Sequence, residues 1–178
     1  MLLDRVAADQ PTIAADRFVL RPLRRSDAGL IAHYAGDPRV ARGTRSIPHP
    51  FPPGAAEALI ARATAPGRTE DVWALDGGTQ GEVLGLVHLV RMDRRQSEVS
   101  YWVAPAFWNT GLASEAVRAL IAANPHGAEQ VFAEVFQDNP GSARVLTNTG
   151  FEYLGDAEAF SVARDAVVPT WTYALRVQ

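Results

Sequence analysis

The residues from Trp108 to Ser114 could bind an anion through their backbone. They read Trp-Asn-Thr-Gly-Leu-Ala-Ser and connect a predicted strand at 97–103 to a predicted amphipathic helix at 112–123. The loop carries no charged side chain, so binding would come from the unpaired amide N–H groups of a helix N-terminus, which favour a phosphate or pyrophosphate. The alternative is an ordinary strand-to-helix turn that binds nothing, because short glycine motifs are common.

A second segment, residues 131–151, carries the signals of a helix start and a helix end. Asn139 followed by Pro140 predicts a helix N-terminus, with Asn139 as the N-cap and Pro140 in the first helical position. Gly150 predicts the left-handed residue that ends the helix. By itself, this segment indicates a helix rather than a reaction centre.

The residue types that are missing narrow the chemistry. The chain has no cysteine, which excludes disulfides, thiolate nucleophiles, thiolate-bound zinc and iron–sulfur clusters. All 17 basic residues are arginine, so there is neither a Schiff-base lysine nor the lysine of a phosphate-binding P-loop. The four histidines show no metal-ligand spacing, and we expect no metal. A net charge of -3 disfavours a sequence-independent nucleic-acid binder, so we expect no nucleic-acid partner.

The length of the chain, 178 residues, is that of one domain. We expect a flexible N-terminal arm at residues 1–15 and a single domain at 16–178. The first residues include early acids and no long apolar stretch, which disfavours a signal peptide, and no segment approaches a transmembrane span. The sequence therefore predicts a cytoplasmic protein with no membrane partner.

The order of the elements predicts an α+β fold. Predicted strands cover 17–23, 72–76, 83–90, 97–103, 130–136, 151–154 and 170–176, and predicted helices cover 26–34, 54–65, 112–123 and 140–149. Ser26 is the expected cap of the first helix. Gly77 and Gly78 predict an antiparallel hairpin between the second and third strands. Such an order indicates a mixed sheet, and no N-terminal glycine fingerprint supports a dinucleotide-binding fold.

Taken together and in order, these segments resemble the GNAT acetyltransferase superfamily, and more closely its RimJ/RimL-type branch of ribosomal-protein N-acetyltransferases. The segments that carry the resemblance span residues 16–176; they are Asp16–Leu23 with Asp27-Ala28, Gly85, Glu98–Val103, Trp108–Ala113, and Asn139-x-x-Ser142 through Gly150-Phe151. Trp108 stands where the superfamily pattern has Arg or Gln, although this branch often carries Trp there. Asn109 replaces a common glycine and can adopt a positive φ.

The resemblance implies a mixed, mainly antiparallel twisted sheet of about seven strands with flanking helices. In it, the fourth and fifth strands, at 97–103 and 130–136, splay apart. Acetyl-CoA is the implied co-substrate, with its pantetheine arm between these strands and its pyrophosphate on the loop. The implied cofactor-binding residues are Val103, Trp108, Asn109, Thr110, Gly111, Leu112, Ala113, Ser114, Asn139 and Ser142.

The implied reaction is direct transfer of the acetyl group to an amine, and it needs residues in three roles. Glu98 is the first candidate for the base and Glu134 the second, acting directly or through water, although a solvated strand face would also explain both. A backbone N–H near Val103 is expected to hold the developing oxyanion. Many relatives use a tyrosine as the acid at the position of Leu146, so here Ser142 would donate to the departing thiolate.

The acceptor stays open at this stage. A protein N-terminal α-amine, a small polyamine or amino acid, and an aminoglycoside would each supply a primary amine. A non-catalytic acyl-CoA-binding or regulatory module with the same fold is the main alternative, and an unrelated α+β nucleotide binder is another. At family level the resemblance also implies a homodimer.

Overall fold

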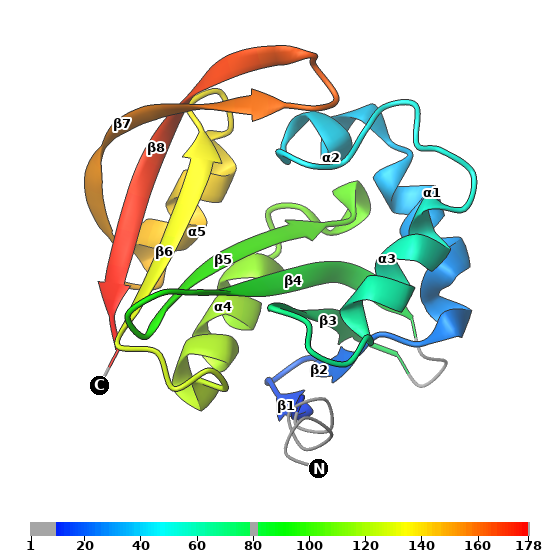
Figure 1. The fold of residues 1–178 in the computed structure, drawn as a ribbon, viewed down its shortest axis with the longest axis horizontal. Coiled ribbons are helices and arrows are strands. Elements are labelled where there is room, and N and C mark those ends of the chain that lie inside the picture. Colours follow the sequence, from blue (N-terminus) through cyan, green and yellow to red (C-terminus); the bar gives the residue numbers. More distant parts are fainter. Residues whose placement is uncertain (1–9, 79–81, 178) are drawn as a thin grey trace.

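One eight-stranded sheet runs through the computed structural model, which describes residues 10–78 and 82–177 (Figure 1). The strands are β1 (Ile13–Ala14), β2 (Val19–Pro22), β3 (Glu70–Asp76), β4 (Val83–Met92), β5 (Gln96–Val103), β6 (Gln130–Phe136), β7 (Glu152–Ser161) and β8 (Ala166–Arg176). Their order in the sheet is β1-β2-β3-β4-β5-β6-β8-β7. Every neighbouring pair is antiparallel except β5 and β6, which are parallel. The predicted α+β fold is confirmed.

Helices cover both faces of this sheet (Figure 1). They are α1 (Ala28–Ala35), α2 (Pro38–Arg42), α3 (Ala55–Ala63), α4 (Leu112–Ala123) and α5 (Pro140–Asn148), with 3-10 turns at Arg25–Asp27 and Pro105–Phe107. Val117 of α4 and Leu146 of α5 are buried in one apolar cluster, and Ile31 of α1 and Ile60 of α3 in another. We call the corresponding sides of the sheet the α4 face and the α1 face.

The side chains of β5 alternate between these two faces, as they must in a strand. Val99 and Val103 are buried in the cluster that contains α4, and Tyr101 packs against it. Trp102 belongs instead to the cluster on the α1 face. Glu98 therefore shares the α1 face with Trp102, while Tyr101 points toward the helices that follow β5 and β6.

The strands β5 and β6 are paired only where they begin. Three residue pairs join them, and the last is Glu98 with Phe132. Beyond this pair, β5 continues to Val103 and β6 to Phe136 without pairing with each other. β6 is paired with β8 along its whole length. We call this divergence the fork. The predicted splaying of the strands at 97–103 and 130–136 is confirmed.

The strand that sequence reasoning missed is β1. Residues 1–9 of the predicted arm lie outside the described residues, but Ile13 and Ala14 pair with Leu20 and Val19 of β2. The indole Nε1 of Trp73 also donates a hydrogen bond to the carbonyl of Pro11, at 2.8 Å. Ile13 and Ala14 therefore belong to the sheet, and Pro11 is hydrogen-bonded to β3, so this part of the predicted arm is folded against the domain.

The helix α2 was also missed, although its start has a clear signal. Asp37 is the N-cap and accepts a hydrogen bond from the N–H of Arg39 at 2.9 Å, and Pro38 occupies the first helical position. These are the residue types that favour a helix start. With five residues, α2 is too short to show an apolar period, so the sequence pattern did not reveal it.

The predicted cap at Ser26 is wrong. The chain enters α1 through a 3-10 turn in which the carboxylate of Asp27 accepts a hydrogen bond from the N–H of Arg24, at 2.7 Å. Asp27 is buried and also pairs with the guanidinium of Arg21, at 2.8 Å. Pairing with Arg21 lets a buried carboxylate take the position that an exposed serine was expected to fill.

Gly85 of β4 allows β5 to run close beside it at the end of the fork. Gly85 faces Val103 across the ladder. A Cβ atom at this position would lie 2.3 Å from the carbonyl oxygen of Trp102 and 2.9 Å from the Cα of Val103. Both contacts are with backbone, so any side chain at residue 85 would push β5 toward the open side of the fork.

We predict that Gly85→Ala lowers the free energy of unfolding by about 1–3 kcal/mol, as overpacking does. Gly29→Ala is the matched control, because Gly29 lies in α1 with no atom within 4 Å of an added Cβ; helix propensity makes it neutral or stabilising by up to about 1 kcal/mol. Urea denaturation measures both. Equal midpoints for the two variants would contradict the close approach of β4 and β5.

Candidate functional site

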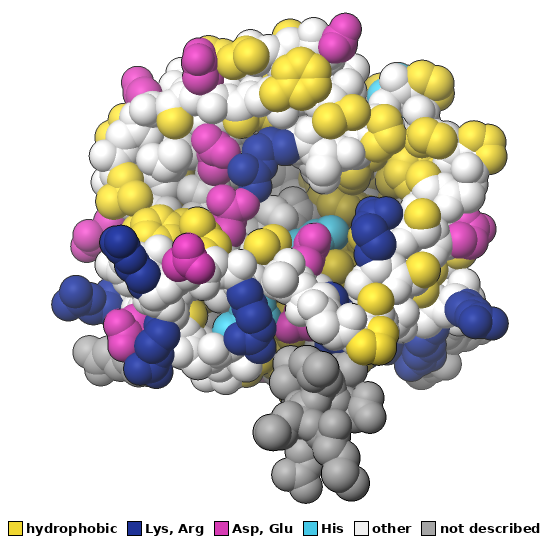
Figure 2. Space-filling view, viewed as in Figure 1, with side chains coloured by type: hydrophobic (Ala, Val, Ile, Leu, Met, Phe, Trp, Pro, Cys, Tyr) yellow, Lys and Arg dark blue, Asp and Glu magenta, His cyan; other side chains and the backbone are white. Residues whose placement is uncertain are grey.

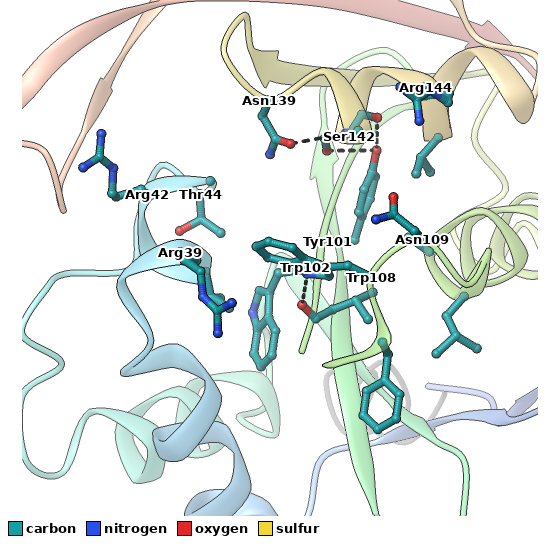
Figure 3. Close-up of a pocket in the computed structure, with 18 of the residues that line it drawn as sticks. Arg39, Arg42, Thr44, Tyr101, Trp102, Trp108, Asn109, Asn139, Ser142 and Arg144 are labelled. Atoms are coloured by element: carbon teal, nitrogen blue, oxygen red, sulfur yellow. Dashed lines mark hydrogen bonds between the residues drawn. The ribbon is translucent and has the colours of Figure 1, made fainter. Parts of the chain in front are cut away.

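A cavity of about 910 Å³ opens at the mouth of the fork (Figure 3). The N-termini of α4 and α5 bound it on one side, and α2 bounds it on the other. Tyr101 and Trp102 both line it, although their side chains point to opposite faces of the sheet. The cavity therefore reaches from the α4 face through the fork toward the α1 face.

Nine of the ten residues predicted to bind the cofactor line this cavity. They are Val103, Trp108, Asn109, Gly111, Leu112, Ala113, Ser114, Asn139 and Ser142. Thr110 does not line it. The hydroxyl of Thr110 donates to the carbonyl of Phe107, and its own carbonyl accepts a hydrogen bond from Arg17 Nη1 at 2.9 Å.

Two residues with positive φ shape the loop before α4. Asn109 has φ 61°, as the sequence predicted, and Gly111, the N-cap of α4, has φ 82°. The N–H of Glu115 makes the first bond of the helix, to the carbonyl of Gly111 at 3.0 Å. The N–H groups of Leu112–Ser114 precede it and have no acceptor within the helix. They lie at the positive end of the helix dipole and beside the cavity, an arrangement that suits an anion.

Arg17 holds this loop although it does not itself line the cavity. Its Nε donates to Glu115 Oε2 at 2.9 Å, and its backbone N–H donates to Glu115 Oε1 at 3.1 Å. Together with its bond to the Thr110 carbonyl, these contacts tie the β1–β2 connection to the first turn of α4. These contacts with Arg17 fix the position of the loop.

The end of β5 presents a backbone donor to the fork. The N–H of Ala104 donates to the carbonyl of Leu84, at 2.9 Å, so it points toward β4. Because backbone groups of successive residues in a strand point in opposite directions, the N–H of Val103 points away from β4 and into the fork. The carbonyl of Val103 points the same way and accepts a hydrogen bond from Trp108 Nε1 at 2.7 Å.

Asn139 and Ser142 form the start of α5, as predicted. The side chain of Asn139 is the N-cap and accepts from the N–H of Ser142 at 3.4 Å. The hydroxyl of Ser142 donates to the hydroxyl of Tyr101 at 3.3 Å, and Tyr101 donates in turn to the Ser142 carbonyl at 2.8 Å (Figure 3).

Sequence reasoning missed Tyr101 as a site residue. The alternation of Val99, Tyr101 and Val103 could have indicated it, since it puts Tyr101 on the α4 face. Burial raises the pKa of Tyr101 against the opposing effect of the hydrogen bond with Ser142, so the phenol stays protonated at neutral pH. Leu146, which stands where many relatives are expected to have a tyrosine acid, is fully buried in the core.

Four arginines line the cavity in a chain of net charge -3. Arg39 lies over the ring of Trp108, with its guanidinium carbon 5.8 Å from the centroid. Arg164 pairs with Asp138, which lowers the pKa of that carboxyl, and it also donates to the carbonyl of Arg42. The fourth, Arg144, comes from α5. These residues belong to three distant segments, so the sequence gave no sign that they meet.

The two candidate bases do not line the cavity. Glu98 and Glu134 lie on the α1 face, where Figure 2 shows charged side chains gathered in a hollow over the middle of the sheet. Arg45 Nη1 donates to Glu134 Oε1 at 2.9 Å, and Arg45 Nη2 donates to Glu98 Oε1. Burial lowers the pKa of Arg45, but the two carboxylates raise it further, so the guanidinium is charged.

A second pair lies on the same face. His88 Nδ1 is 2.5 Å from Glu70 Oε1, and this hydrogen bond lowers the pKa of Glu70.

Within residues 10–78 and 82–177, no three acidic, histidine or cysteine side chains are grouped as metal ligands would be. None of the helices in these ranges is long and apolar enough to cross a membrane.

The sequence matches the model of a family described as an acetyltransferase (GNAT) domain, over residues 17–152. The uncharacterized N-acetyltransferase YoaA of Bacillus subtilis is 25% identical over 107 residues, which are 58% of this chain and 60% of that protein. The uncharacterized N-acetyltransferase p20 of Bacillus licheniformis is 22% identical over 170 residues, or 92% of this chain and 95% of that protein.

Solved structures share the fold. The microcin C7 self-immunity acetyltransferase MccE, in complex with acetyl-CoA and AMP, has a TM-score of 0.79 at 13% identity and covers 91% of this chain and 93% of its own. Spermidine N-acetyltransferase from Vibrio cholerae, in complex with CoA and spermine, has a TM-score of 0.75 at 16% identity and covers 90% of this chain and 95% of its own. Mycobacterium smegmatis RimJ, in complex with CoA-disulfide, has a TM-score of 0.75 at 19% identity and covers 93% of this chain and 87% of its own.

Proposed function

The chain belongs to the GNAT acetyltransferase family, and from this premise we propose that it transfers the acetyl group of acetyl-CoA directly to a primary amine. The amine belongs to a protein N-terminus or to a small molecule. The observation that carries the proposal is the fork, with the unpaired amides of α4 at its mouth. Relatives with this fold have been solved with acetyl-CoA or CoA, which supports the choice of cofactor.

The cofactor would bind with its charged end at the mouth of the fork. Its pyrophosphate would lie on the N–H groups of Leu112–Ser114, and Arg39 and Arg144 would offset its charge. The pantetheine arm would then pass between β5 and β6, beyond the point where these two strands are paired with each other. This route brings the thioester to the N–H of Val103.

Each step of the reaction would then have a group assigned to it. The amine attacks the thioester carbonyl, a C–N bond forms, and the N–H of Val103 binds the oxygen as it becomes negative. A base on the α1 face takes the proton that the amine loses. The C–S bond breaks and coenzyme A leaves as a thiolate, to which Ser142 donates a hydrogen bond once its hydroxyl turns away from Tyr101, its present acceptor.

One observation favours a second candidate function, a non-catalytic acyl-CoA-binding module. Both candidate bases are held by Arg45, and neither of them lines the cavity. Thiol release from acetyl-CoA with a panel of protein N-terminal peptides, polyamines and aminoglycosides separates the two functions. An acetyltransferase releases thiol with at least one amine, whereas a binding module binds coenzyme A and releases none.

Gly111→Ala should weaken binding of coenzyme A by about tenfold, measured by calorimetry. The substitution strains a residue at φ 82° by about 1–2 kcal/mol, and relief of that strain moves the amides of α4. Gly54→Ala is the matched control, because Gly54 is the N-cap of α3 at φ 80° and does not line the cavity. If both variants bind coenzyme A equally well, the loop is not the pyrophosphate site.

Ser142→Ala should lower kcat by about 10–100-fold with little change in the KM for acetyl-CoA, because a hydrogen bond to a charged group contributes about 1.5–3 kcal/mol. Thr147→Ala removes another hydroxyl from α5, one that is exposed and bonds to the Arg144 carbonyl, and should leave kcat unchanged. A Ser142→Ala enzyme with the kcat of the Thr147→Ala enzyme would exclude Ser142 from the reaction.

A further inference from the structure

Arg45 connects four segments at the closed end of the fork. Its backbone carbonyl accepts a hydrogen bond from the N–H of Val162 in the β7–β8 turn, at 3.0 Å. Its guanidinium reaches Glu98 on β5 and Glu134 on β6. Glu98 is the last residue of β5 that is paired with β6, so Arg45 bridges the two strands where their pairing with each other stops.

The two carboxylates that Arg45 holds are not equivalent. Both oxygens of Glu134 are occupied, because Oε1 accepts from Arg45 and Oε2 accepts from the hydroxyl of Thr170 at 2.7 Å. Glu98 accepts from Arg45 through Oε1 alone, and no other donor among the described residues reaches it. Its Oε2 is therefore free to take a proton.

We propose that Arg45 is a positioning residue that assigns different roles to the two glutamates, an inference that rests on the proposed acetyl transfer. Glu134 is the fixed counter-charge of Arg45. Glu98 is the base, and its Oε2 takes the proton that the amine loses as the C–N bond forms, directly or through one water. The amine thus approaches from the α1 face, and the acetyl group reaches it through the fork from the other side.

Few other charges face this group. From β4, His88 is on the same face and pairs with Glu70 of β3. From β8, Thr170 contributes an uncharged hydroxyl, and β6 contributes Glu134 itself. Among the described residues, Arg45 is therefore the cation in direct contact with Glu98. Removing Arg45 should change the proton affinity of Glu98 more than removing any other charged group would.

The experiment compares kcat, KM and the pH profile of the wild type with those of four test variants and one control variant, using the amine that gives the fastest thiol release. Glu98→Gln should lower kcat by about 100-fold or more, the loss expected of a general base. Glu134→Gln should lower it by less than about tenfold, because its amide still accepts from Arg45.

Arg45→Met should move the acidic limb of the kcat profile to higher pH, since a carboxylate without its neighbouring cation holds a proton more tightly. Arg45→Lys should reverse part of that shift, because lysine returns a positive charge to this position. If Arg45 had a purely structural role, the two variants would not differ in this way. The control is Arg91→Met, an exposed arginine near the end of β4. Thermal melting checks that each variant is folded.

The outcomes separate this assignment from the proposed function. An active wild type in which Glu134→Gln costs as much as Glu98→Gln, or in which both Arg45 variants keep the wild-type pH profile, overturns the assignment alone. A wild type that binds coenzyme A but releases no thiol with any amine overturns the proposed function, and the assignment fails with it.

Discussion

The pairing of β5 with β6 ends after three residue pairs, and the site depends on that constraint. Backbone groups that lose their ladder partners must find others, because an unpaired buried N–H or C=O is costly. β6 keeps its pairing with β8 on its other edge, and the Val103 carbonyl finds a new donor in the indole of Trp108. The N–H of Val103 faces the gap, and a ligand carbonyl is the partner that suits it.

The fork also separates two kinds of charge. Around its mouth stand the amides of α4 and the arginines of the cavity, which suit a polyanionic cofactor. On the α1 face stand Glu98 and Glu134, which suit an amine and its proton. Because a sheet has two faces, the two proposed substrates would reach one point from opposite sides without competing for the same groups.

The sequence predicted best the parts of the site that are local in the chain. The bounds of α4 and β6 agree with the structure, because each has a clear apolar period and a glycine, proline or polar residue at its ends. Tyr101, Arg45 and the cavity arginines were missed, since their roles depend on which distant segments meet. Glu98 and Glu134 were found as residues, but the guanidinium between them comes from a loop with no signal of its own.

A crystal structure with acetyl-CoA bound is the most direct test of the central claim, that the fork receives the thioester. We predict that the thioester carbonyl oxygen lies about 3 Å from the N–H nitrogen of Val103, a hydrogen-bond distance. The pyrophosphate should lie on the amides of Leu112–Ser114. A cofactor that lies outside the gap between β5 and β6, with its carbonyl far from Val103, would contradict the claim.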